Sequence, residues 1–193
     1  VSQPEMMPLL KEIRAVLDSY PQRYAVGETF LGEDQAKTAA SYCGSDRLHA
    51  AFNFAFTHCK WDAGQFLRAI QHWANSLGDD AWPTYVLNNH DVRRSASRYA
   101  RGDDDRRLKV AAAMLLTLRG TPYLYYGEEI GMRDIKVGRN EIQDPIGKHY
   151  WPFFIGRDGC RSPMQWNAAE HAGFSQAAPW LKVHPNHSTR NVE

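Results

Sequence analysis

The sequence has few cysteines and no long apolar run. Its three cysteines are an odd number at wide spacing, which implies no disulfide framework and favours a reducing compartment. The longest apolar run, residues 110–118, is too short to cross a bilayer, and no basic and apolar signal segment opens the chain. We therefore expect a cytoplasmic protein with no membrane partner.

An excess of charge of one sign is also absent. The chain has 23 basic and 22 acidic residues and a formal net charge of +1, so it has no electrostatic footprint for nucleic acid. Its length of 193 residues and its hydrophobic content of 43% are typical of one soluble globular domain. Aromatic residues make up 12%; they suit a carbohydrate site, although core packing explains most aromatics.

Two clusters of possible metal ligands have simpler explanations. The acidic run at residues 103–105 is expected to cap the helix that follows and to complement its dipole. Cys43, His49, His58 and Cys59 do not have the spacing of a zinc site. We therefore expect neither a metal nor an organic cofactor.

Strands and helices alternate along the first two thirds of the chain. Helical periodicity covers residues 2–20, 62–77 and 104–119, with a possible short helix at 33–42. Ser2 and Asp62 are expected to cap the first two of these helices. One face of the helix at 62–77 is apolar and consists of Phe66, Leu67, Ile70, Trp73 and Leu77. Short apolar runs at residues 23–26, 48–56, 84–87 and 122–126 predict strands. This alternation predicts βαβ units and a parallel sheet. From about residue 130 no period is present, and we expect a long, ordered loop region.

Polar residues come directly after the predicted strands, at the edge where a (β/α)8 barrel builds its active site. Glycoside cleavage needs carboxylic acids at such an edge, and Glu28 and Asp91 are the candidates, although strand-end carboxylates are common. Glu128 and Glu129 could bind substrate, but for Glu128 we favour a structural role through a buried ion pair.

Five segments resemble glycoside hydrolase family 13, the α-amylase superfamily. They resemble its third, fourth and eighth-strand motifs, the loop of its α-glucosidase branch and the segment after that loop: residues 25–29 (AVGET), 85–91 (YVLNNHD), 127–132 (GEEIGM), 157–166 (RDGCRSPMQW) and 179–181 (PWL). They occur in the family's order and together cover nearly the whole chain. The resemblance implies an α-glucoside oligosaccharide or disaccharide as substrate.

The resemblance also implies roles for individual residues. Glu28 would be the general acid/base, and Asp91 would stabilise the transition state. His90 would bind a sugar hydroxyl in the same subsite. Arg161 would bind a hydroxyl or orient Asp91, and Arg94 would line the mouth of the site.

The nucleophile of this family, an aspartate in a G-x-R-x-D motif at the end of the fourth barrel strand, does not occur in the sequence. The resemblance therefore implies the C-terminal half of the barrel, strands five to eight. We expect four β/α units in residues 1–132 and an active-site-covering loop region in residues 133–193. We also expect the chain to be inactive alone, because a retaining mechanism needs a nucleophilic carboxylate in addition to the acid/base, and the nucleophile is missing.

Two alternatives stay open. One is a glucosyl-transferring or isomerising relative, such as a trehalose synthase or a sucrose isomerase. The other is a non-catalytic half-barrel that serves as a binding or assembly module. Open strand edges in a half-barrel would favour self-association.

Overall fold

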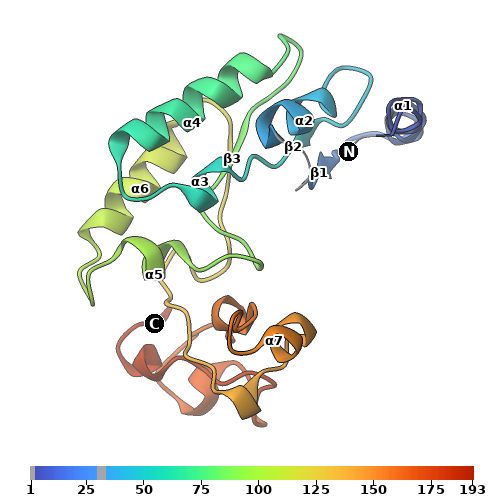
Figure 1. The fold of residues 1–193 in the computed structure, drawn as a ribbon. Helices are drawn as coiled ribbons and strands as arrows, with labels where there is room; N and C mark the ends of the chain where they lie inside the picture. Colours follow the sequence, from blue (N-terminus) through green and yellow to red (C-terminus); the bar gives the residue numbers. More distant parts are fainter. Residues whose placement is uncertain (1–2, 30–33) are drawn as a thin grey trace. The chain divides into compact units, whose positions relative to one another are not determined.

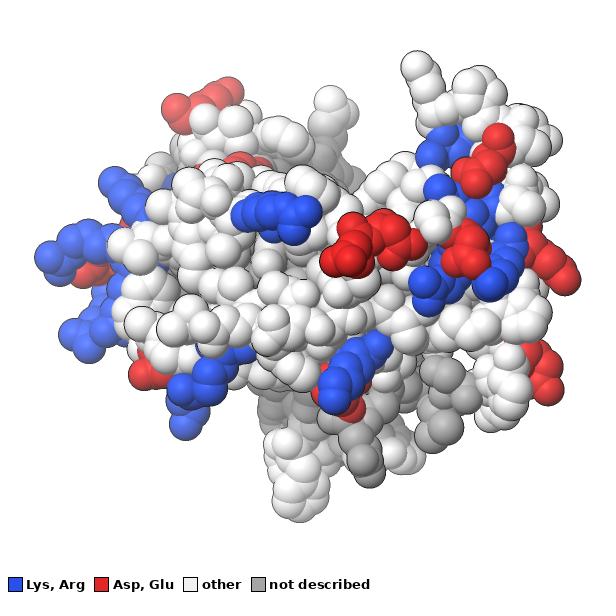
Figure 2. Space-filling view, turned by 90° about the horizontal axis from the view of Figure 1, so that it is seen from above, with Lys and Arg blue, Asp and Glu red and all other residues white. Residues whose placement is uncertain are grey.

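The computed structural model describes residues 3–29 and 34–193. The chain divides into two compact units, Val1–Val86 with Met114–Tyr123 and Leu87–Ala113 with Leu124–Glu193. None of the helices in the described part of the chain is both long enough and apolar enough to span a membrane. On the face shown in Figure 2, basic and acidic side chains lie next to one another, in line with the balanced charge.

The first unit carries the strands. Its elements are α1 (Met6–Asp18), β1 (Val26–Gly27), α2 (Gln35–Ser41), β2 (Ala50–Ala51), α3 (Ala55–His58), α4 (Ala63–Ser76), β3 (Thr84–Val86) and β4 (Thr121–Tyr123) (Figure 1). Helix α6 (Arg106–Thr117) begins in the second unit and ends in the first.

The strands form two parallel pairs, as the alternation of strands and helices predicts. β1 pairs with β2, with Val26 opposite Ala50, and β3 pairs with β4, with Thr84 opposite Thr121. The Thr84 hydroxyl donates a hydrogen bond of 2.6 Å to the carbonyl oxygen of Ala51, which joins β3 to β2. The four strands found in residues 3–29 and 34–193 are two or three residues long, shorter than the apolar runs suggest.

The predicted second strand, residues 48–56, is wrong over its last part, where residues 55–58 form α3. The helical turn places Phe56, which is 1% exposed, against Phe66 and Tyr85. Its ring stacks on Tyr85 with centroids 5.4 Å apart and meets Phe66 edge-on at 5.3 Å. Burying an aromatic ring among others outweighs the local strand preference of a short apolar run.

The other predicted helices are present with shorter bounds. The Asp62 carboxylate accepts a hydrogen bond of 2.8 Å from the Gln65 amide and caps α4, as expected from the capping pattern. On the predicted apolar face of α4, Trp73 is 0% exposed whereas Leu67 is exposed. Helix α1 begins at Met6, and the predicted cap Ser2 lies outside the described residues.

The acidic run before α6 has a structural role, as predicted. Asp104 accepts a hydrogen bond of 3.0 Å from the Arg106 amide at the start of the helix. Asp105 forms ion pairs with Arg133 and Arg190, at 2.7 and 2.8 Å. The run therefore fixes two distant points of the second unit to the start of α6.

The second unit is mostly irregular, and residues 133–193, where a loop region was expected, belong to it. It contains α5 (Ser95–Tyr99), α7 (Pro145–Tyr150) and four single turns of 3₁₀ helix at Arg139–Glu141, Asp158–Arg161, Glu170–Gly173 and Pro185–Ser188. Hydrogen bonds of buried polar side chains hold this unit together, in place of the backbone hydrogen bonds of a sheet. Gln165, 0% exposed, donates hydrogen bonds to the Asn186 side chain and to the carbonyl oxygen of Arg190.

Candidate active site

The loop that carries Asp91 is held by its own side chains. The Asn89 side-chain oxygen accepts hydrogen bonds from the amides of Asp91 and Val92, at 2.9 and 3.2 Å, which is the pattern of an Asx turn. Asn88, 2% exposed, donates to the Ser95 hydroxyl at 2.9 Å. Hydrogen bonds within residues 88–95 therefore fix the backbone around Asp91.

Two guanidinium groups hold the carboxylate of Asp91. Its Oδ1 accepts hydrogen bonds from Arg157 Nη1 at 3.0 Å and from Arg161 Nη2 at 2.9 Å. His90 Nε2 lies 3.6 Å from the same oxygen, and Arg161 Nε donates to the carbonyl oxygen of His90 at 2.8 Å. Charge-assisted bonds of this kind fix a carboxylate in orientation. Within residues 3–29 and 34–193, no hydrogen bond engages its other oxygen, Oδ2.

The structure thus brings His90, Asp91 and Arg161 together, as the sequence predicts. Arg157 also touches Asp91, and sequence reasoning gave it no role. Arg157 is the first residue of the segment 157–166. Its position in the same family motif as Arg161 is the signal that could have indicated a role. The carboxylate of Asp144, with a side chain 0% exposed, binds Arg157 from the other side at 2.9 Å; nothing in its local sequence marks it.

A cysteine supports the same loop. Cys160 is 3% exposed, and its thiol lies 3.4 Å from the carbonyl oxygen of His90. Burial raises the pKa of the Cys160 thiol to about 11. A protonated thiol is a poor nucleophile, and the thiol packs the loop against His90.

Arg94 does not line a site mouth, and this prediction is corrected. It is 1% exposed, and its guanidinium carbon lies 5.0 and 4.7 Å from the ring centres of Tyr125 and Tyr126. Its Nη1 donates to the carbonyl oxygen of Tyr126 at 2.6 Å, and its amide donates to Asp134 at 2.9 Å. Stacking on two tyrosine rings holds the cation in the interior.

Glu128 has a structural role, although its hydrogen-bond partners are neutral. Its carboxylate accepts hydrogen bonds from the Ser95 hydroxyl and the Tyr125 amide, both at 3.1 Å. Burial raises the pKa of Glu128 to about 7, and these two bonds oppose the rise only in part. The group fixes the turn after β4 to the start of α5.

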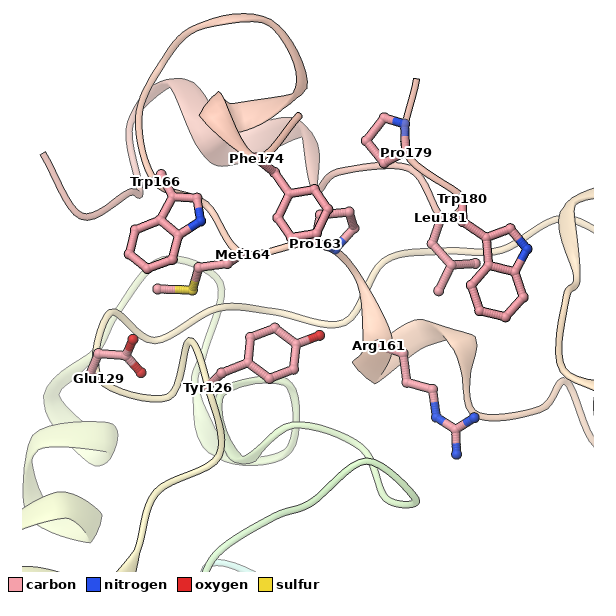
Figure 3. Close-up of a pocket in the computed structure, with 10 residues that line it drawn as sticks. All are labelled: Tyr126, Glu129, Arg161, Pro163, Met164, Trp166, Phe174, Pro179, Trp180 and Leu181. Carbon is pink, nitrogen blue, oxygen red and sulfur yellow. The ribbon is translucent and has the colours of Figure 1, made fainter. Parts of the chain in front are cut away.

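An open cavity of about 500 Å³ lies beside Arg161. Figure 3 shows the rings of Tyr126 and Phe174 facing each other across it, while the guanidinium of Arg161 extends away from them. Trp180 is 77% exposed at its rim. The lining residues are mostly apolar: Tyr126, Glu129, Arg161, Pro163, Met164, Trp166, Phe174, Pro179, Trp180 and Leu181. Such rings suit the apolar face of a sugar or of another chain segment.

Glu28 belongs to the first unit. It follows β1 directly and is exposed. Gly27 precedes it, and a Cβ there would lie 2.6 Å from the Leu48 side chain, so a larger residue at this position requires the Leu48 side chain to move. The predicted action of Glu28 together with Asp91 stays a prediction.

Parallel strands with carboxylates at their ends, and a carboxylate held between two guanidiniums, fit the active-site edge of a barrel glycosidase. The chain belongs to the family described as Alpha amylase, catalytic domain, which it matches over residues 1–193. It is therefore a partial barrel of a glycoside hydrolase family.

The relatives include glucosidases and a transferase. The chain is 36% identical to a probable alpha-glucosidase of Rhizobium meliloti (strain 1021), over 99% of this chain and 35% of that protein. It is 33% identical to probable oligo-1,6-glucosidase 2 of Bacillus subtilis (strain 168), over 95% of this chain and 38% of that protein. The solved structure of the alpha-glucosyl transfer enzyme XgtA matches with a TM-score of 0.92 and 36% identity, over 98% of this chain and 35% of that one. The chain thus spans little more than a third of these proteins.

Proposed function

We propose that the polypeptide to which this chain belongs is a retaining α-glucosidase. It would hydrolyse terminal α-1,4 or α-1,6 glucosyl bonds of short α-glucosides, and this chain would supply strands five to eight of its barrel. The observation that carries the proposal is the Asp91 carboxylate, fixed through Oδ1 by Arg157 and Arg161. An oriented carboxylate with a second oxygen available can bind sugar hydroxyls and stabilise positive charge at the anomeric carbon.

The remaining roles follow from retaining chemistry. Glu28 donates its proton to the glycosidic oxygen while the bond from that oxygen to the anomeric carbon breaks. An aspartate from the missing half of the barrel bonds to that carbon. Glu28 then takes a proton from water, the water oxygen attacks the anomeric carbon, and the aspartate leaves. His90 binds a hydroxyl of the same sugar. The site is proposed to lie in the reducing cytoplasm, where the three free cysteines are stable.

The first experiment compares this chain with the longer polypeptide, using p-nitrophenyl α-glucoside. We expect turnover from the longer polypeptide and none from residues 1–193, which lack the nucleophile. Glu28→Gln and Asp91→Asn in the longer polypeptide should each lower kcat by about 10³-fold or more. Glu12→Gln, an exposed carboxylate of α1, is the matched control and should leave kcat unchanged. Turnover by residues 1–193 that Glu28→Gln abolishes would contradict the inactivity of this chain.

A second candidate activity is glucosyl transfer, because the similarity to the alpha-glucosyl transfer enzyme XgtA is as strong as that to the alpha-glucosidase. Both activities share the first step and differ in whether water or a sugar hydroxyl accepts the glucosyl group. Incubation with maltose and product analysis separates them: glucose alone indicates hydrolysis, and longer or rearranged oligosaccharides indicate transfer. A longer polypeptide that produces neither, yet is folded, would favour the non-catalytic module.

A further inference from the structure

Asp144 is a buried carboxylate that binds Arg157 through both of its oxygens. Its side chain is 0% exposed. Oδ2 accepts hydrogen bonds of 2.9 Å from both the backbone amide and Nε of Arg157, and Oδ1 accepts one of 2.9 Å from Arg157 Nη2. These hydrogen bonds hold the pKa of Asp144 far below its usual range. The ionised Asp144 carboxylate therefore binds both the side chain and the backbone amide of Arg157.

The contact with Asp144 determines the direction of Nη1, the remaining guanidinium nitrogen of Arg157. The nitrogens of a guanidinium are coplanar and rigidly spaced. Once Nε and Nη2 are bound to Asp144, the direction of Nη1 is determined, and Nη1 lies 3.0 Å from Asp91 Oδ1. One guanidinium thus connects a buried carboxylate to the carboxylate of the candidate active site.

The backbone around Asp144 is held as firmly as its side chain. Asp158 Oδ2 accepts hydrogen bonds from the amides of Gln143 and Asp144, at 2.6 and 3.0 Å. Gly147 and Gly156 allow the two segments to meet: a Cβ on Gly147 would lie 2.8 Å from the Cα of Gly156. The segments 143–147 and 156–158 are therefore held together on both sides of the Asp144–Arg157 contact.

We propose that Asp144 is a positioning residue of the active site, which acts by holding Arg157 in the orientation that fixes Asp91. The proposal rests on the proposed glucosidase function. Without the Asp144 carboxylate, the Arg157 side chain gains rotational freedom, and Asp91 loses one of the two cations that set its orientation. Misplacement of a transition-state contact by about 1 Å can lower the rate by roughly 10²-fold.

The test is a double-mutant cycle in the longer polypeptide, with p-nitrophenyl α-glucoside as substrate. Asp144→Asn keeps the size and the capping oxygen at the start of α7 but removes the charge. We expect it to lower kcat/KM by about 10- to 100-fold in the wild-type background, and to have no further effect when Arg157 is already Leu. Equal losses in both backgrounds, or no loss in the wild-type background, would overturn the proposal.

The control breaks an exposed aspartate–arginine ion pair elsewhere in the same unit. Asp104 binds the Arg106 side chain at 2.7 Å on the exposed surface, so Asp104→Asn should leave kcat/KM unchanged. If Asp144→Asn does not fold, Arg157→Lys tests the relation from the other partner. Lysine keeps the charge but cannot hold two carboxylates in one plane, so the same loss is expected, and wild-type kcat/KM would overturn the proposal.

A readout that needs no turnover separates this proposal from the proposed function. The Nε–H of Arg157 should be protected from hydrogen exchange in a ¹⁵N NMR experiment and should lose that protection in Asp144→Asn. Absence of turnover by the wild-type polypeptide would refute the glucosidase function alone. Unchanged protection in Asp144→Asn would refute the positioning of Arg157 by Asp144, whatever the activity.

Discussion

The Glu128 carboxylate accepts a hydrogen bond of 3.1 Å from the hydroxyl of Ser95, a residue 33 positions earlier in the chain. The same hydroxyl accepts a hydrogen bond of 2.9 Å from Asn88. Asn88 lies three residues before Asp91, so a connected set of polar groups runs from the turn after β4 to the loop of the candidate active site. Such networks are stabilising only while every member keeps its partners.

Glu128→Gln should change how stability depends on pH. Burial raises the pKa of Glu128 to about 7 from its ordinary 4.5, so the unfolded chain ionises first as the pH rises. The stability present below pH 4.5 is therefore lost progressively up to about pH 7, by on the order of 3 kcal/mol. Urea unfolding of this chain at pH 5 and pH 8 should show Glu128→Gln gaining stability over the wild type at the higher pH.

The control for that experiment is Glu129→Gln, which changes the exposed carboxylate next to Glu128. It should follow the wild-type dependence on pH. If Glu128→Gln also parallels the wild type from pH 5 to pH 8, burial of the Glu128 carboxylate does not affect folding in this way.

Arg94→Met should destabilise the second unit, because Arg94 is 1% exposed and supplies hydrogen bonds and two ring contacts. Loss of a charged donor to a buried carbonyl group, together with loss of the ring contacts, should cost about 2–4 kcal/mol. The midpoint of urea unfolding measures this cost. Arg93→Met, at a neighbouring side chain that is 71% exposed, should cost less than about 1 kcal/mol. Equal effects of the two substitutions would contradict the buried role of Arg94.

The chain alone is expected to self-associate. Helix α1 exposes Leu9, Ile13 and Val16 by 48%, 41% and 62%, and a contiguous apolar surface favours association. Light scattering should give a mass above that of one chain, and replacing the three residues by Gln should lower it. A monodisperse monomer of the wild-type chain would contradict this prediction.

Local sequence patterns determined much of the fold. Helical periodicity and the Asp62 cap predicted α4, and the alternation of apolar runs with helices predicted parallel strands. Each helix, cap and apolar run depends on residues within about one or two helical turns of one another, so local sequence patterns predict it. The order of the motifs likewise identified Asp91, His90 and Arg161 as neighbours, because family resemblance carries tertiary information that periodicity lacks.

Other features were decided by the tertiary structure. Residues 55–56 joined a helical turn because Phe56 could bury its ring between Phe66 and Tyr85. Arg94 lies in the interior and not at the predicted mouth of the site, because its guanidinium contacts two tyrosine rings there. Arg157 spans 66 positions of sequence to reach Asp91 and 13 to reach Asp144. Ion pairs and ring contacts between distant segments depend on how the chain returns upon itself, which no local pattern specifies.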